Sequence, residues 1–157
     1  MLIADILSVE RVACDVEMAS KKRALENVSQ LVCSQSPSLN PNEVFESLVA
    51  REKLGSTGLG KGIAIPHGRL KSGNETIAAF IQLTNGVDFD APDGQTVDLI
   101  LALLVPPEST DEHLQILAQL SERFRQEDLR QQLRDSHSPE LIYKLLTEQN
   151  STAERGH

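Results

Sequence analysis

The spacing of apolar residues in the first part of the chain predicts a strand followed by a helix. Val12, Cys14 and Val16 alternate with polar or small residues, which indicates a short, half-buried strand. Apolar residues after Ser20 recur at helical spacing, at positions 24, 25, 28, 31 and 32. Because a serine side chain caps helix N-termini well, we expect the first helix to begin there.

A second helix is predicted to begin at about residue 41, where three start signals coincide. Asn40 can cap the helix, Pro41 lacks an N–H group that would have no helical partner, and Glu43 stands three residues after the cap. Apolar residues continue at helical spacing as far as Val49. Gly55 is expected to end the helix, since helices often terminate at a glycine.

Two segments in the middle of the chain predict strands, at residues 76–83 and 97–105. The second segment is almost continuously apolar, as expected of a strand that is covered on both faces. The dipeptides Asn85-Gly86 and Asp93-Gly94 favour turns and therefore predict a hairpin excursion between the strands.

Two further helices are expected after Thr110 and after Ser138-Pro139. Helices and strands thus alternate along residues 1–148. This order indicates an α/β fold, a single-domain sandwich with a central mixed β-sheet flanked by helices. Residues 149–157 form a polar tail, which we expect to fray.

Composition and charge exclude several classes of function. The chain has 157 residues and a net charge of −8, which opposes binding to the phosphates of a nucleic acid. No apolar run approaches the roughly 20 residues that span a bilayer, so we expect a cytoplasmic protein that is not membrane-embedded. Cys14 and Cys33 lack metal or redox spacing and are expected to be buried, reduced thiols.

The segment from Gly55 to Gly62 contains four glycines in eight positions and nearly matches the phosphate-binding loop of nucleotide hydrolases. Gly62 stands where that motif needs Ser or Thr, and the segment follows a predicted helix instead of a strand, so nucleotide binding is disfavoured. Glycines still let backbone amides approach an anion. We therefore predict a phosphate cradle, with an ordinary tight loop as the alternative, at Gly55, Ser56, Thr57 and Gly58.

This loop and the apolar segment after it deliver His67, which stands between Pro66 and Gly68. Arg51, near the end of the second helix, could reach the histidine and bind phosphate oxygens bidentately. His113 falls in the first turn of a later helix, where the helix dipole attracts anions. Taken singly, these residues could equally be a strand-end histidine, a solvated arginine and a surface histidine.

Other catalytic chemistry finds little support in the sequence. Two histidines without a carboxylate or thiolate at ligand spacing make a poor zinc site, and neither HExxH nor GxSxG is present. One tyrosine and no tryptophan disfavour stacking on nucleic acid bases. We expect no metal and no other cofactor, which leaves a nucleophilic histidine.

Taken together, residues 48–69, LVAREKLGSTGLGKGIAIPHGR, resemble the active-site segment of the mannitol/fructose-type IIA family of the phosphotransferase system. The similarity is closest to the nitrogen-regulatory (PtsN) branch and extends over residues 1–148. It implies that His67 carries a phosphoryl group, and that Arg51 and His113 are the other active-site residues. A neutral imidazole can attack phosphorus without a separate base, which agrees with this chemistry.

The resemblance implies a carrier that accepts phosphate from an HPr-like phosphocarrier (NPr). Such a carrier regulates nitrogen- and potassium-related metabolism by phosphorylation-dependent binding to targets such as sensor kinases or ion transporters. The alternative is a sugar-transport IIA that donates phosphate to a IIB domain of a fructose/mannitol permease. A third hypothesis, a binding module without phosphoryl transfer, is disfavoured by the three intact site residues. We expect a monomer or a weak dimer.

Overall fold

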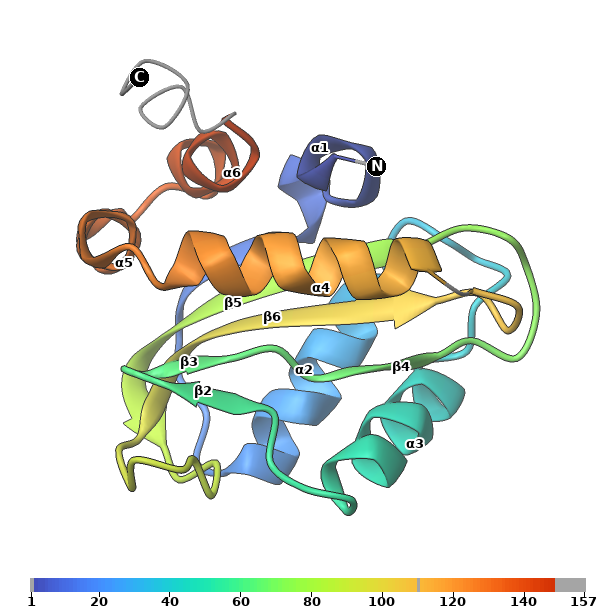
Figure 1. Ribbon diagram of the computed structural model, residues 1–157, viewed down its shortest axis with the longest axis horizontal. Helices are drawn as coiled ribbons and strands as arrows, with labels where there is room; N and C mark the ends of the chain where they lie inside the picture. Colours follow the sequence, from blue (N-terminus) through green and yellow to red (C-terminus); the bar gives the residue numbers. More distant parts are fainter. Residues whose placement is uncertain (1, 110, 149–157) are drawn as a thin grey trace.

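A mixed β-sheet organises the computed structural model, which describes residues 2–109 and 111–148 but not the side chains of residues 112–114 (Figure 1). Strand order is β1-β5-β6-β3-β2, and β4 also pairs with β6. The β5–β6 and β2–β3 pairs are antiparallel, whereas the other three pairs are parallel. The strands of this sheet are β1 (Val12–Val16), β2 (Gly58–Gly60), β3 (Ile63–Ala64), β4 (His67–Arg69), β5 (Ile77–Val87) and β6 (Val97–Val105).

Helices cover both faces of this sheet, which confirms the predicted α/β sandwich (Figure 1). One face packs against α2 (Lys21–Cys33) and α3 (Pro41–Glu52). A short 3-10 turn, η1 (Val9–Arg11), precedes β1. The opposite face packs against four helices: α1 (Ile3–Ile6), α4 (Asp111–Phe124), α5 (Glu127–Asp135) and α6 (Pro139–Thr147).

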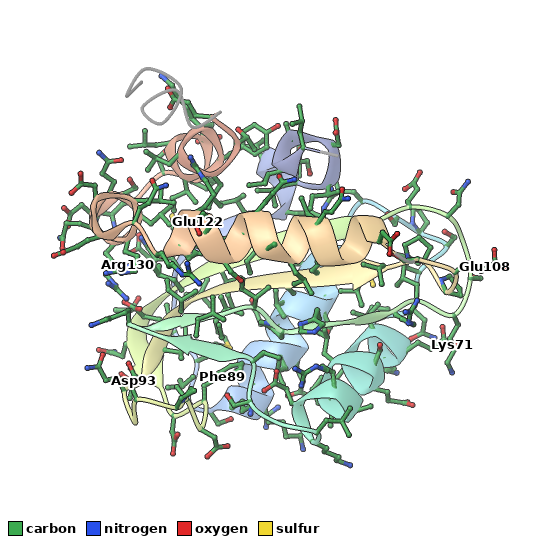
Figure 2. All side chains as sticks on the ribbon, in the orientation of Figure 1. Lys71, Phe89, Asp93, Glu108, Glu122 and Arg130 are labelled. Carbon is green, nitrogen blue, oxygen red and sulfur yellow. The ribbon has the colours of Figure 1, made fainter. Side chains whose placement is uncertain are left out.

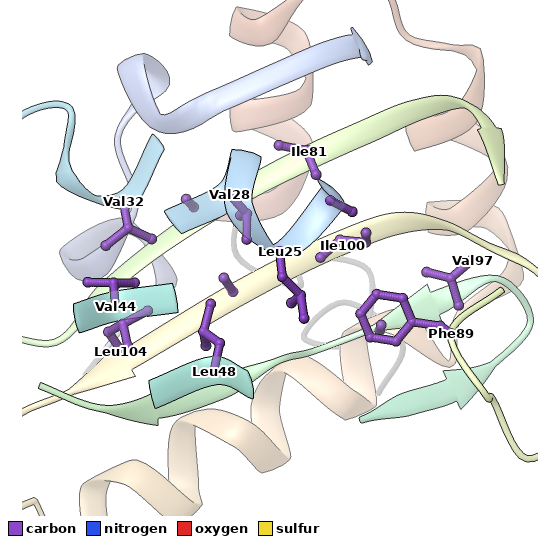
Figure 3. Close-up of a cluster of buried hydrophobic side chains, with 14 of the residues drawn as sticks. Leu25, Val28, Val32, Val44, Leu48, Ile81, Phe89, Val97, Ile100 and Leu104 are labelled. Carbon is purple, nitrogen blue, oxygen red and sulfur yellow. The ribbon is translucent and has the colours of Figure 1, made fainter. Parts of the chain in front are cut away.

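Strand β6 contributes side chains alternately to the two hydrophobic clusters, which explains its continuous apolar sequence. Ile100, Ala102 and Leu104 join α2 and α3 in the cluster that Figure 3 shows. The intervening residues, of which Leu101 and Leu103 are fully buried, join the cluster beneath α4 and α6. Charged residues such as Lys71, Asp93 and Glu108 lie at the periphery (Figure 2).

Three of the predicted helix starts are confirmed by side-chain caps. Ser20 Oγ accepts a hydrogen bond from the backbone N–H of Arg23, and Asn40 Oδ1 accepts one from Asn42. Ser138 Oγ accepts one from the N–H group of Leu141. The predicted Thr110 cap lies outside the described residues, as does the predicted tail 149–157.

The prediction that Asn85-Gly86 forms a turn was wrong, because β5 runs through both residues to Val87. The pairing with β6 shifts between Gln82 and Val87. A Cβ atom at Gly86 would lie 2.5 Å from Thr96 Oγ1, so this glycine permits close approach between β5 and the residue that precedes β6. The turn predicted at Asp93-Gly94 is confirmed by a 3.0 Å hydrogen bond from Gly94 N to Ala91 O.

Helix α5 was not predicted from the sequence. Only Leu129 and Leu133 of this helix are buried, so its apolar stripe consists of two leucines one turn apart and its remaining surface is polar. Arg134 fixes the helix to the sheet through an ion pair of 2.9 Å with Asp98 and a hydrogen bond to Lys61 O. The position of α5 therefore depends on contacts distant in sequence, which local periodicity does not reveal.

Candidate functional site

His67 is the first residue of β4, beside the C-terminal part of β6. Its register partner is Leu103, whose N–H group donates to the carbonyl of Pro66 at 2.9 Å. Ile65, two residues upstream, is buried. We expected a loop to deliver the histidine, but the chain after Gly62 follows the edge of β6 as β3 and then β4. The sheet therefore fixes the backbone on both sides of the ring.

Hydrogen bonds of the His67 ring select one neutral tautomer. Nδ1 lies 2.9 Å from the carbonyl oxygen of Ile65. Because a carbonyl oxygen can only accept, Nδ1 carries the hydrogen. Nε2 then holds a lone pair and accepts a hydrogen bond from Arg51 Nε at 3.2 Å.

The surroundings of His67 also keep its ring neutral. Burial lowers the pKa of His67 below its ordinary value of 6.5, and the Arg51 guanidinium lowers it further. The hydrogen bond to the Ile65 carbonyl acts in the opposite direction but does not reverse the net shift. The imidazole is therefore unprotonated on Nε2 at neutral pH, which is the state a nucleophile requires.

Arg51 reaches His67 because α3 packs closely against β4. A Cβ atom at Gly68 would lie 2.3 Å from Ser47 Oγ and 3.2 Å from the Ser47 carbonyl carbon, so only glycine permits this approach. Ser47 Oγ also donates to Arg69 O at 2.8 Å. In the last turn of α3, Arg51 donates from Nη1 to the carbonyl of Gly55 at 2.8 Å. The guanidinium is thus held at both ends, by the loop and by the histidine.

The predicted phosphate cradle is largely occupied by internal hydrogen bonds. Ser56 Oγ donates to Phe89 O at 2.7 Å and Thr57 Oγ1 donates to Glu52, so neither hydroxyl hydrogen is available to an anion. The amides of Gly55, Thr57 and Gly58 donate to Glu52 O, Glu52 Oε1 and Ser56 Oγ respectively. The glycine-rich segment also contains β2, so it is a hairpin more than an open loop.

The other histidines are not brought to this site by the described residues. His113 lies within α4, but its side chain is outside the described part of the structure. His137 is exposed and lies 2.9 Å from Asp15 Oδ1 through its Nδ1 atom. His157 lies outside the described residues. Among the described side chains, the structure thus brings the predicted residues Arg51 and His67 into contact, and Arg51 also reaches the carbonyl of the predicted residue Gly55.

The described residues contain no cluster of three His, Cys, Asp or Glu side chains that could hold a metal ion. Nor does any helix within residues 2–109 and 111–148 have the length and apolar character needed to cross a membrane. Cys33 is a buried free thiol, as expected, whereas the free thiol of Cys14 is only half-buried.

Comparison with known proteins assigns the chain that carries this site to a family. The family model described as phosphoenolpyruvate-dependent sugar phosphotransferase system, EIIA 2, matches residues 5–149. A nitrogen regulatory protein of Pseudomonas aeruginosa is 44% identical over 146 residues, covering 93% of this chain and 95% of that protein.

Two solved structures share the fold. Nitrogen regulatory protein IIA-Ntr from Neisseria meningitidis matches with a TM-score of 0.87 and 46% identity, over 92% of this chain and 99% of that one. The mannitol IIA protein of Escherichia coli matches with a TM-score of 0.73 and 24% identity, over 88% of this chain and 97% of that one. The second likeness concerns the fold alone.

Proposed function

This chain belongs to the EIIA 2 family of the phosphoenolpyruvate-dependent sugar phosphotransferase system, and we propose that its phosphoryl group is carried on Nε2 of His67. Family membership gives the chain a carrier role between a phosphoryl donor and a phosphoryl acceptor. The observation that supports Nε2 is the pair of hydrogen bonds on the ring. They leave one unprotonated nitrogen, and that nitrogen faces the guanidinium of Arg51.

The proposed reaction is an in-line transfer between two nitrogen atoms. The Nε2 lone pair of His67 forms a bond to phosphorus, while the P–N bond to the donor histidine breaks and its electrons return to the donor. No proton leaves Nε2, because that atom is already unprotonated. The ring becomes cationic, and the hydrogen on Nδ1 stays bonded to the Ile65 carbonyl, which stabilises this charge.

Arg51 is suited to stabilise the charge on the phosphoryl oxygens. Once Nε2 is bonded to phosphorus, the Arg51 Nε–H group loses its acceptor and turns to a phosphoryl oxygen. Phosphoryl transfer depends mainly on positioning and on neutralising the equatorial oxygens, so one pre-positioned guanidinium contributes to both. We assign His113 a supporting role toward the phosphoryl group.

We further propose that the donor is an HPr-like phosphocarrier and that the main role is regulatory. The high identity to proteins named nitrogen regulatory protein supports this hypothesis. Phosphorylation adds a charge of about −1.5 to −2, which is sufficient to change the choice of partner. The alternative is transfer to a IIB domain during sugar import, which the family's description also supports.

Labelling identifies the accepting residue. The chain is incubated with phosphoenolpyruvate, enzyme I and an HPr-like carrier, and the phosphorylated residue is then located by mass spectrometry under alkaline conditions. We expect one phosphoryl group on wild type and none on His67→Ala, whereas His137→Ala should be labelled normally because its ring lies elsewhere. A His67→Ala protein that still takes up one equivalent would refute the assignment.

Onward transfer then separates the two roles. The purified phosphorylated chain is mixed with IIB domains of fructose and mannitol permeases, and the loss of label from His67 is followed. Label retained on the chain in the presence of active IIB domains supports regulation. Rapid and complete transfer to one IIB domain would favour the transport role instead.

A further inference from the structure

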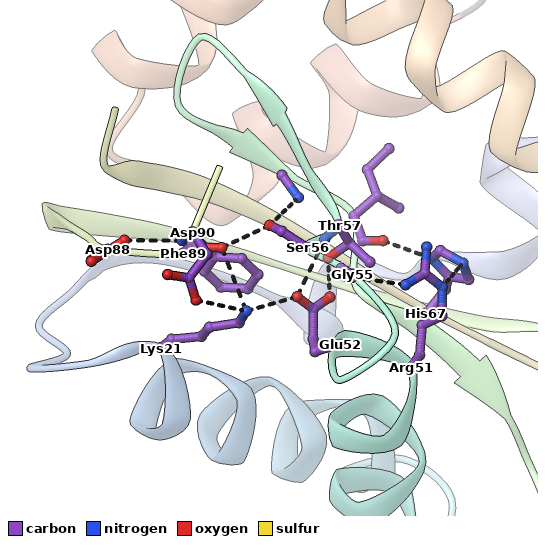
Figure 4. Close-up of polar contacts among 12 residues, drawn as sticks. Lys21, Arg51, Glu52, Gly55, Ser56, Thr57, His67, Asp88, Phe89 and Asp90 are labelled. Atoms are coloured by element: carbon purple, nitrogen blue, oxygen red, sulfur yellow. Dashed lines mark hydrogen bonds and ion pairs between the residues drawn. The ribbon is translucent and has the colours of Figure 1, made fainter. Parts of the chain in front are cut away.

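Glu52 is an almost buried carboxylate directly after Arg51 in the sequence. Its side chain is only 5% exposed. It accepts hydrogen bonds from Thr57 N at 3.2 Å and from the Thr57 hydroxyl, and it lies 2.9 Å from Lys21 Nζ. Figure 4 shows the two neighbours leaving α3 in different directions, with Arg51 toward His67 and Glu52 toward Thr57 and Lys21. These donors satisfy both oxygens of the buried carboxylate, and the lysine balances its charge.

Lys21 joins this carboxylate to a second segment of the chain. Its Nζ atom donates to Phe89 O at 3.4 Å, lies 3.7 Å from Asp90 Oδ2 and stands 4.7 Å from the centre of the Phe89 ring. Ser56 Oγ donates to the same Phe89 carbonyl. The loop after α3 is thus bonded on one side to Glu52 and on the other to the residues that follow β5.

The hydrogen bonds connect Glu52 to the His67 site through the short loop between them. Glu52 holds Thr57, and Gly55, two residues earlier, provides the carbonyl that accepts from Arg51 Nη1. Arg51 Nε then meets His67. We infer that Glu52 is a positioning residue: by fixing Thr57 it holds the Gly55 carbonyl that orients Arg51 against His67.

This inference rests on the proposed function of His67, because orientation of the guanidinium matters only if the site handles phosphate. Arg51 has a long side chain with several rotatable bonds, and its Nε atom meets the histidine only while Nη1 stays anchored. The Gly55 amide keeps its bond to Glu52 O, but release of Thr57 removes the side-chain tether on the other side of the Gly55 carbonyl and so loosens that carbonyl. Lys21 balances the charge of the buried Glu52 carboxylate, which is directed away from His67.

Three variants separate positioning from simple stabilisation. The double variant Glu52→Ala/Lys21→Met removes the tether without leaving an unpaired buried charge. Lys21→Met alone keeps both bonds to Thr57. Thr57→Val preserves the shape of the side chain but removes its hydroxyl donor, and it remains informative if the double variant folds poorly. The matched control is Asp98→Asn, which breaks the Arg134 ion pair at the opposite end of β6 from Leu103.

The first readout is the hydrogen-exchange rate of the Arg51 Nε–H group, measured by 15N NMR and assigned with Arg51→Lys. It requires no phosphorylation, so it stands even if the proposed function fails. We expect exchange about 10-fold faster in the double variant, about threefold faster in Thr57→Val, and unchanged in Asp98→Asn. If the Arg51 Nε–H group exchanges at the wild-type rate in a double variant that is folded, the inference is overturned.

The second readout is the rate of phosphoryl uptake from the HPr-like carrier. Misplacement of a positioned group by about 1 Å can cost roughly 100-fold, so we expect uptake by the double variant to fall about 10- to 100-fold. Lys21→Met should lose less than about threefold, and Asp98→Asn should match wild type. If the double variant and Asp98→Asn melt at the same temperature and take up phosphate at the same rate, the Glu52 tether has no effect beyond fold stability and the inference fails.

Discussion

At the scale of single residues, our proposal that neutral His67 accepts the phosphoryl group predicts how uptake varies with pH. Its pKa lies below 6.5, mainly because the ring is buried. The neutral form therefore persists to more acidic pH than in a free histidine. Uptake should begin to fall only when the pH drops below 6.5. The check is the pH profile of uptake, together with NMR titration of His67. A midpoint at or above 6.5 would contradict this account.

Arg51 should tolerate replacement by lysine poorly, although the charge is kept. Its guanidinium uses Nε toward His67 and Nη1 toward Gly55 at the same time, and an ammonium group cannot reproduce this fork. We expect Arg51→Lys to reduce uptake by about 10-fold or more with little loss of thermal stability. The measurement is single-turnover transfer from the HPr-like carrier, with the exposed Arg23→Lys as the control. Equal rates for both variants would remove Arg51 from the mechanism.

At the scale of elements, the contact between α3 and β4 should be sensitive to a single methyl group. Gly68→Ala would bring Cβ to 2.3 Å from Ser47 Oγ and 3.2 Å from the Ser47 carbonyl carbon, so the serine side chain must rotate and the helix must shift slightly. Overpacking of this kind costs about 1–3 kcal/mol and should also separate Arg51 from His67. The loss of stability, measured by denaturant unfolding, should shrink when Gly68→Ala is combined with Ser47→Ala. Additive effects of the two changes would indicate that this contact is not the cause.

The sequence predicted those elements whose signals are local. Caps at Ser20, Asn40 and Ser138 located three helix starts, and the apolar run of β6 indicated a strand covered on both faces. Local signals failed where pairing at a distance decides the conformation. Gly86 belongs to a strand because of its contact with Thr96, and α5 is held by an ion pair to β6.

In the candidate site, too, the sequence predicted the features with a local signal and missed those that depend on contacts between distant residues. The motif around His67 pointed to the proposed nucleophile, and the family resemblance that the motif carried is confirmed by the comparisons. Hydrogen-bond partners could not be deduced in this way. Glu52 was not singled out, because a glutamate near a helix end is usually exposed, and its burial depends on Lys21 from another helix. The hydroxyl groups of Ser56 and Thr57 indicated donors for a phosphate, but the sequence does not show that both donate to acceptors within the protein.

At the scale of the whole molecule, the net charge of −8 should affect the encounter with the donor. Attraction between this negative chain and a basic contact surface on the carrier would act over about 10 Å at 0.1 M salt but only about 3 Å at 1 M. We expect kcat/KM for uptake from the HPr-like carrier to fall several-fold across this range. The control is chemical phosphorylation by the small anion phosphoramidate, which salt should not slow. Uptake from the carrier that is constant or faster in high salt would exclude electrostatic attraction.

The interruption between β3 and β4 limits which properties of this site amino-acid substitutions can change. Ile65 and Pro66 separate the two strands, and the Ile65 carbonyl binds the histidine ring. The group that decides which nitrogen is reactive is therefore a main-chain atom, common to every amino acid. Side-chain substitutions around the site can remodel partner recognition while this preference is inherited unchanged. If Nε2 is the accepting atom, as we propose, substitutions that change the partner leave the identity of that atom unaltered.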